Sequence, residues 1–261
     1  MDWRDEGILL SARRQGESAA IVEVFTAAHG RHAGVVRGGA SRRMAPILQP
    51  GAEVSAEWSA RIEEHLGAFR LDLMTAHSAR LLDDGAALAA LQAIAALTAV
   101  GLPERAAHPE LYALTRDLVG ALGAAPDWPA RYALWELALL GELGFGLDLS
   151  RCAATGARED LIYVSPRSGI AVSRAAGAPW AARLLPLPGF IRDGTTTGDY
   201  EALRAGLALT GFFLDARLGP ALPRERLPAA RDRAVEAILR AGERARQRTG
   251  TRAATPGEPR S

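Results

Sequence analysis

The sequence is poor in the residues that mark secreted, disulfide-rich and membrane proteins. It has one cysteine and no lysine among its 261 residues. A single cysteine excludes an internal disulfide framework and fits the reducing cytoplasm. The longest apolar run, residues 86–102, is interrupted by Gln92 and Thr98. It is shorter than the ~20 residues of a membrane-spanning helix, and no basic and apolar leader precedes the first strand, so we expect neither a membrane segment nor a signal peptide.

Common catalytic motifs are also missing. The sequence contains no Gly-x-x-x-x-Gly-Lys-Ser/Thr loop, no His-Glu-x-x-His pair and no Gly-x-Ser-x-Gly turn. The glycine-rich segment Gly38-Gly39-Ala40-Ser41 has no lysine and no expected helix behind it. We therefore expect a protein that is not an enzyme and needs no cofactor. A nuclease or transferase with an unrecognised site stays an alternative.

What the sequence does contain begins with five short β-prone segments in its first eighty residues. They span residues 7–11, 19–26, 32–37, 52–58 and 66–73, and they are separated by glycine, serine and proline turns. Five short strands in this length predict a small closed barrel of the OB-fold type, which commonly carries single-stranded nucleic acid. We place this domain at residues 1–76.

Alanine and leucine at helical spacing follow, which predicts an all-helical domain over residues 77–248 and an α+β chain of two domains. Helices are expected over residues 78–99, 108–122, 199–218 and 228–246, with a loop at 184–190 and a disordered tail at 249–261. The helix that begins after Asp127 carries only Arg131, Glu136 and Glu142 as charges. A helix that is apolar on most sides is normally covered on most sides, so we place it at the centre of the domain, with Asp127 as its N-cap.

The segment 150–178 has the rhythm of a zinc knuckle without its ligands. A zinc ribbon places Cys-x-x-Cys on each of two turns, about 15–20 residues apart. The four positions at that spacing are Cys152, Thr155, Ser173 and Ala176. Structural zinc requires four nitrogen or sulfur ligands, so we predict no metal here. A hairpin with its turn at 165–169 is still expected between the two half-sites.

Charge is distributed unevenly, although the net charge is only +1. Residues 81–150 hold three arginines and nine acidic residues, whereas residues 224–261 hold ten arginines and five acidic residues. A second basic cluster lies in the expected barrel. Its members fall near strand ends and in the glycine-rich loop, where a barrel of this type presents its ligand: Arg13, Arg14, Arg31, Arg37, Arg42 and Arg43. We interpret them as a phosphate-binding face, although a solvated surface would look the same.

Several of these segments resemble the RecO family of bacterial recombination and DNA-repair proteins. The resemblance rests on Gly144-Phe145-Gly146 before the cysteine and on the Ser165–Gly169 turn. It also rests on Phe25-Thr26 with His29-Gly30-Arg31, and on Leu48-Gln49-Pro50. Many members carry a four-cysteine knuckle in a helical domain behind an OB-fold, so the knuckle of this chain is a degenerate one.

The resemblance implies a cytoplasmic, nucleoid-associated mediator of homologous recombination. Such a protein binds single- and double-stranded DNA and anneals complementary strands. With RecR it helps to load RecA onto strands coated by single-strand-binding protein. The alternative is an OB-fold protein-interaction scaffold that does not bind DNA directly.

The family also docks the acidic, aromatic-ended tail of single-strand-binding protein on its helical domain. Such a tail needs an apolar pocket beside an arginine that can bind its terminal carboxylate. Arg131, with Tyr132 and Trp135 in the next turn, offers both. The alternative interpretation is that Trp135 is part of the core and that Arg131 is solvated.

Overall fold

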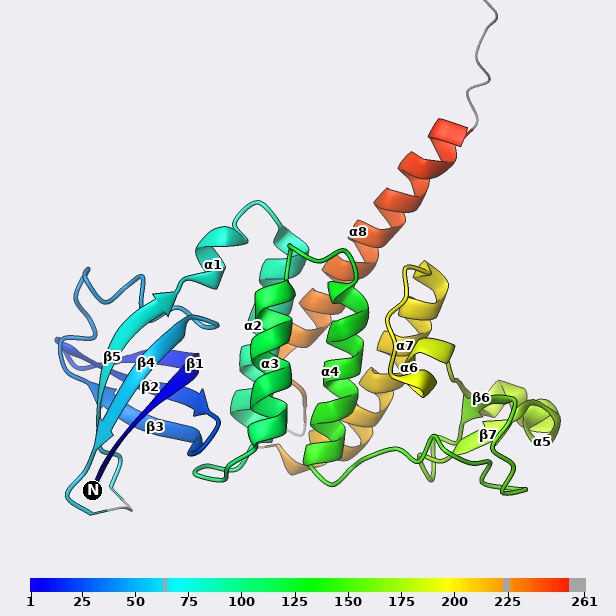
Figure 1. Cartoon of the computed structure of the whole chain (residues 1–261), viewed down its shortest axis with the longest axis horizontal. Helices are drawn as coiled ribbons and strands as arrows, with labels where there is room; N and C mark the ends of the chain where they lie inside the picture. The colour runs from blue at the N-terminus through cyan, green and yellow to red at the C-terminus, as the bar shows by residue number, and fades with distance from the viewer. Residues whose placement is uncertain (63–64, 223–225, 254–261) are drawn as a thin grey trace, which may run out of the picture.

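The computed structural model describes residues 1–62, 65–222 and 226–253 (Figure 1). Its first five strands close into a barrel in the order β1-β2-β3-β5-β4. They are β1 (Asp2–Gln15), β2 (Ala19–Thr26), β3 (Gly30–Val36), β4 (Glu53–Ser59) and β5 (Ala68–Thr75). β3 and β5 pair in parallel, and the other neighbours pair antiparallel. The expected five-stranded OB-type barrel is confirmed, with β1 extending further at both ends than predicted.

β1 contributes to two hydrophobic cores, because successive strand residues point to opposite faces. Leu9 packs inside the barrel with Val24, Val54 and Trp58. Its neighbours Ile8 and Leu10 pack against the helices instead. The strand therefore reads as a continuous apolar run rather than an alternating one, and it joins the barrel to the helical domain.

A tight turn completes this junction. Gly30 has a positive φ of 62°, and a Cβ at this position would lie 1.8 Å from the carbonyl oxygen of Ala106. The backbone N–H of Arg105 donates to the carbonyl of Arg31 at 2.8 Å. Only glycine allows the barrel and the helical domain to approach this closely.

The helical domain begins with α1 (His77–Arg80) and α2 (Gly85–Gly101), followed by α3 (Pro109–Ala121) and α4 (Trp128–Glu142). One helix was expected over residues 78–99, but the chain breaks it at 81–84. Asp84 then caps α2 by accepting from the backbone N–H groups of Ala86 and Ala87. Asp127 sits at the N-cap of α4 as predicted, but its carboxylate accepts from Arg131 instead of from the helix backbone.

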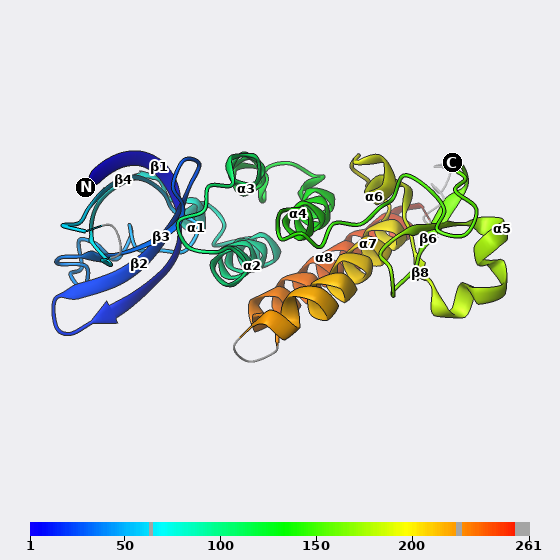
Figure 2. The ribbon, with the colours of Figure 1, turned by 90° about the horizontal axis from the view of Figure 1, so that it is seen from below.

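The segment that contains β6, β7 and α5 lies beyond α4, at the end of the molecule opposite the barrel (Figures 1 and 2). β6 (Leu161–Val164) and β7 (Ala171–Ser173) form the expected hairpin, and β8 (Leu185–Pro186) joins β6. α5 (Arg174–Gly177) and η1 (Ala178–Arg183) follow β7 and precede β8 in the chain. The predicted loop at 184–190 is only partly irregular, because it contains β8 and the start of α6 (Gly189–Asp193).

The last helices are α7 (Tyr200–Phe213), the single-turn η2 (Leu214–Leu218) and η3 (Gly219–Ala221), and α8 (Ala229–Ala253). α8 is longer than predicted, so the tail expected from residue 249 continues as helix to Ala253. The remainder of that predicted tail, 254–261, lies outside the described residues. No helix in the described part of the chain is long and apolar enough to cross a membrane.

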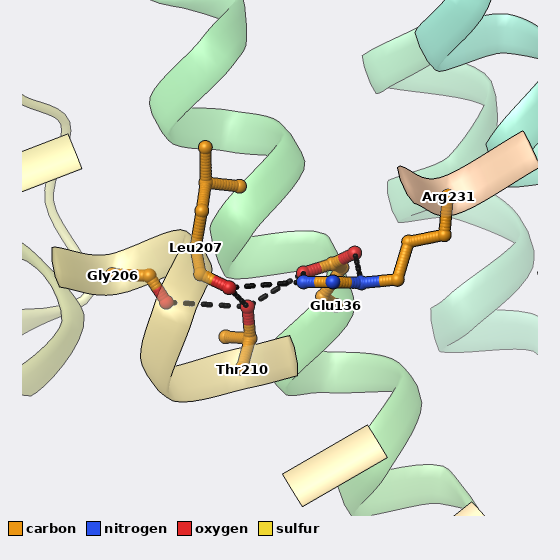
Figure 3. Close-up of polar contacts among 5 residues, drawn as sticks. All are labelled: Glu136, Gly206, Leu207, Thr210 and Arg231. Carbon is orange, nitrogen blue, oxygen red and sulfur yellow. Dashed lines mark hydrogen bonds and ion pairs between the residues drawn. The ribbon is translucent and has the colours of Figure 1, made fainter. Parts of the chain in front are cut away.

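α4 lies at the centre of the helical domain, as its apolar circumference predicts, and it carries a buried ion pair (Figure 3). Glu136 is fully buried and accepts from Arg231 of α8 at 2.8 and 3.0 Å. The hydroxyl of Thr210 in α7 also donates to this carboxylate. The guanidinium of Arg231 donates in addition to the carbonyl of Leu207 at 2.9 Å. One ion pair therefore ties three helices together.

Candidate nucleic-acid interface

The barrel carries a groove of about 1060 Å³ between the loop that follows β3 and the strands β1, β4 and β5. The loop runs from Arg37 to Ala52, and no acidic residue occurs between Val24 and Ala52. Met44, Ile47 and Leu48 pack the loop against the barrel core. Arg42 and Arg43 remain exposed on it. The apolar anchors thus fix a basic loop over one side of the barrel.

Two ladders of paired side chains cross the three strands beside this loop. In the first, Trp3 of β1 lies opposite Trp58 of β4, which lies opposite Phe69 of β5. The rings of Trp3 and Trp58 are stacked at 5.9 Å. Trp58 and Phe69 are buried and form a floor, whereas Trp3 is partly exposed. Trp3 is therefore the one ring of this ladder that reaches the surface, and His29 stacks on it at 4.1 Å.

The second ladder is charged. Arg4, Glu57 and Arg70 face one another across the same strands. Glu57 lies 3.6 Å from Arg4 and 3.9 Å from Arg70. Asp2 and Asp72 on the same strands also line the groove, so its excess positive charge comes from Arg37 and Arg43 of the loop. The sequence interpretation missed Arg4 and Arg70, because they lie outside the dense arginine cluster and only the strand register brings them together.

The six arginines of the predicted phosphate-binding face separate into three groups. Arg37 and Arg43 line the groove, and Arg42 is exposed on the same loop. Arg14 of β1 lies opposite Ala20 of β2, and Gly39 of the loop packs on Ala20. Arg14 therefore lies on the same side of the barrel as the loop. Arg13 is the next residue along the strand and points to the opposite face.

Arg31 forms the third group, and its position differs from the one predicted. Its side chain is only 14% exposed and is paired with Glu23 and with Glu104. Its Nε also donates to the carbonyl of Leu102 at 2.9 Å. Glu104 and Leu102 follow α2, so Arg31 holds the barrel to the helical domain. A guanidinium occupied in this way is not available to a phosphate.

A buried histidine lies behind the aromatic floor. His32 is 5% exposed, and neither ring nitrogen has a hydrogen-bond partner among the described residues. Its ring packs edge-on against Trp58 at 4.6 Å. Burial, with the nearby charges of Arg105 and His29, lowers the pKa of His32 from 6.5 to about 4. His32 is therefore a neutral part of the barrel core at physiological pH.

The structure does not form the predicted tail pocket from the aromatic residues of the central helix, because both rings belong to the core. Tyr132 is 0% exposed and Trp135 is 2% exposed. The indole N–H of Trp135 donates to the hydroxyl of Thr115 at 2.9 Å. Arg131 is exposed and bound to Asp127 at 3.0 Å. The sequence places the three residues in adjacent turns, but two point inward and one points outward.

The degenerate knuckle is held by hydrogen bonds instead of metal ligands. The Sγ atom of Cys152 accepts from the backbone N–H of Ser173 at 3.3 Å and from its hydroxyl at 3.5 Å. Burial raises the pKa of this thiol, but the donors of Ser173, Thr155 and Ala154 outweigh burial and lower it to about 6. One thiol with Thr155, Ser173 and Ala176 does not fit a structural zinc site. In the part of the chain that the structure describes, no three His, Cys, Asp or Glu side chains are placed to hold a metal.

Comparison with known proteins supplies a family for this fold. Residues 1–74 match the model of the recombination protein O N-terminal domain, and residues 82–226 match that of its C-terminal domain. The chain is 55% identical over 241 residues to the DNA repair protein RecO of Cereibacter sphaeroides. The aligned residues make up 92% of this chain and all of that protein. This chain is 52% identical over 240 residues to the DNA repair protein RecO of Ruegeria sp., covering 92% and 99% of the two chains. The corresponding protein of Dinoroseobacter shibae is 48% identical over 241 residues, with 92% and 99% covered.

Proposed function

Because this chain belongs to the RecO family of recombination and DNA-repair proteins, we propose that it binds single- and double-stranded DNA through the groove on its barrel. The observation that carries this proposal is the basic loop fixed beside the charged ladder. Arg37, Arg42 and Arg43 are exposed on a segment without any acidic residue. Arginine forms paired hydrogen bonds with phosphate oxygens, and its charge releases counterions from the nucleic acid.

Phosphate contact, rather than base stacking, supplies the affinity. Trp3 is the one partly exposed ring of the groove, and its face is already covered by His29 at a centroid distance of 4.1 Å. Base stacking on aromatic platforms contributes about 1–3 kcal/mol per base where it occurs. Without a free platform, binding depends on charge, so it is strongly salt-dependent and weakly sequence-selective.

We further propose that the protein is a recombination mediator. When bound to DNA it anneals complementary strands and, with RecR, loads RecA onto strands coated by single-strand-binding protein. We place it in the cytoplasm at the nucleoid, without a catalytic step of its own. Annealing of strands precoated with the cognate single-strand-binding protein tests this role, and a failure to anneal them would contradict it.

The groove itself is tested by Arg42→Gln with Arg43→Gln. Each lost phosphate contact should reduce the slope of log Kd against log salt by roughly one unit, about equally for different sequences. A matched control changes Arg192 and Arg204 to Gln, because each is exposed and already paired, with Asp193 and Glu201 respectively. An unchanged affinity and salt slope in the loop variant would show that the groove does not bind DNA.

A protein-interaction scaffold is the second candidate, and one feature supports it. An apolar groove of about 670 Å³ lies between the barrel and α2, with Leu10, Leu88 and Ala96 among its lining. Leu82 and Val100 border it with 72% and 42% of their surface exposed. Such a groove suits a partner protein such as RecR. If the protein has no salt-dependent affinity for DNA, this candidate replaces the first.

A further inference from the structure

α8 consists of two halves with different surroundings. Ala230, Ala234 and Ile238 are buried, and the partly buried Gly242 continues this ridge at intervals of four residues. The ridge packs α8 against α2 and reaches Tyr200 of α7. After Gly242 every side chain to residue 248 is exposed. Figure 1 shows this second half projecting from the bundle, on the far side of α3 and α4 from the barrel, and Figure 2 agrees.

A ridge of arginines runs along α8 from the end of its packed half into the projecting half. Arg240, Arg244 and Arg248 are spaced by four residues, which places them on one side of the helix about 6 Å apart. Arg240 is 3.4 Å from Glu236. Among the described residues, no carboxylate pairs with Arg244 or Arg248. Like charges at this spacing repel one another and destabilise a helix, so this ridge gains from an anionic partner.

Arg246 has a different role on the same turn. Its guanidinium pairs with Glu201 of α7 at 2.8 Å and lies 4.9 Å from the ring of Tyr200. This contact holds the base of the projecting half to α7. The direction in which the arginine ridge points is therefore fixed by the fold, although among the described residues the ridge forms no ion pair with another element.

The composition of the projecting half limits the class of partner. Its described side chains, residues 243–248, are Glu-Arg-Ala-Arg-Gln-Arg. A helix that lies on a membrane inserts large apolar residues, and a protein interface has an apolar or aromatic centre. Neither is present. Duplex DNA carries one negative charge per about 1.7 Å and is bound by charge alone in its non-specific mode.

We propose that the arginine ridge of α8, formed by Arg240, Arg244 and Arg248, is a second binding surface for a nucleic-acid backbone. This inference rests on the proposed DNA-binding function and extends it, and the ridge lies beyond residue 226, where the match to the family model ends. With the barrel groove on one side of the helices and the ridge on the other, one molecule can hold two strands or two duplex segments at once. The ridge thereby supplies the second contact that bringing two strands together requires.

The experiment compares three full-length variants by fluorescence anisotropy over a salt series. The ridge variant carries Arg240→Gln, Arg244→Gln and Arg248→Gln, because glutamine keeps a helix propensity similar to that of arginine. The control carries Arg151→Gln, Arg174→Gln and Arg192→Gln, which removes the same charge from arginines already paired with aspartates. The third variant changes the ridge arginines to lysine. Circular dichroism checks that the helix content is retained.

We expect the ridge variant to lose roughly two to three units of salt slope for duplex DNA and at least about tenfold in affinity at 0.1 M salt. Energy transfer between two separately labelled, non-complementary strands should also be lost. The control should keep both properties, and the lysine variant should keep most of the slope. An unchanged slope and unchanged energy transfer in the ridge variant would overturn the inference.

Two further outcomes separate the ridge from the groove. If the Arg42→Gln, Arg43→Gln variant binds DNA normally while the ridge variant does not, the groove proposal fails and the ridge stands. If the ridge variant binds DNA normally but loses affinity for poly-glutamate, the ridge serves an acidic protein segment, and the inference is overturned while the groove is unaffected.

Discussion

The barrel and the helical domain contain similar pairs of arginine and aromatic residues, but the two regions use them differently. In the barrel, Trp3, Trp58 and Phe69 form the floor of a groove beside exposed arginines. In the helical domain, Tyr132 and Trp135 are buried and the neighbouring Arg131 points outward. A barrel can leave one end of its interior at the surface, whereas a bundle surrounds its central helix. The same residue types therefore give a surface site in one region and a core in the other.

The largest effect is expected where the helical domain buries a charge. Glu136→Ala leaves Arg231 buried without its partner, and breaking a buried pair costs about 3–5 kcal/mol of unfolding free energy. Urea unfolding followed by circular dichroism measures this loss. The double variant Glu136→Met, Arg231→Met should recover most of it, because two apolar side chains leave no unpaired charge. A loss below about 1 kcal/mol in Glu136→Ala would show that the pair does not hold the three helices together.

The barrel should be the more acid-sensitive region. The pKa of His32 is lowered in the folded state to about 4, so the unfolded chain binds the proton more readily between about pH 4 and 6.5. The stabilising contribution is complete above pH 6.5 and is lost as the pH falls to about 4, by about 3 kcal/mol at most. Acid titration of the near-ultraviolet signal of the barrel tryptophans measures it. His32→Phe should flatten this dependence, and an equally acid-sensitive variant would assign the effect to other groups.

Arg131→Ala should have a small effect, which sharpens the contrast with Arg231. The Arg131 side chain is 46% exposed, and its ion pair with Asp127 lies on the surface. Surface substitutions away from buried networks change stability little, so we expect a shift in Tm of roughly 1–2 °C. Calorimetry with an acidic, aromatic-ended peptide should give equal affinity for the variant and the parent. A clear loss of peptide affinity would return the tail site to this helix.

No effect is expected from metal removal at the knuckle. Thr155, Ser173 and Ala176 replace the thiolates of a zinc site, and Ser173 donates to Cys152 in place of a metal. We expect elemental analysis to find no stoichiometric zinc and a chelator to leave Tm unchanged. About one zinc per chain would contradict this expectation and would require ligands from outside these four positions.

The sequence indicated which segments become strands and helices, because that depends on local spacing. Alternation and turn residues predicted five strands, and the apolar circumference of residues 128–142 predicted the central helix. Two features of the fold could not be predicted from the local spacing of residue types. The break between α1 and α2 depends on the cap formed by Asp84, and the joint role of β1 in two cores depends on the helices that cover its second face.

Only the tertiary structure decided which arginines are exposed and which are buried in ion pairs. Arg31 and Arg231 look like Arg42 and Arg43 in the sequence. Arg31 pairs with Glu23 on the neighbouring strand and with Glu104, 73 residues away, and Arg231 pairs with Glu136, 95 residues away. A guanidinium exposed to water can bind phosphate, whereas one that is paired and buried holds the fold together. Composition and spacing therefore determined that this chain forms a barrel with an arginine-rich loop and a helical bundle. Only the packing of distant segments determined which of its arginines can bind a ligand, since burial and pairing are properties of neighbours in space.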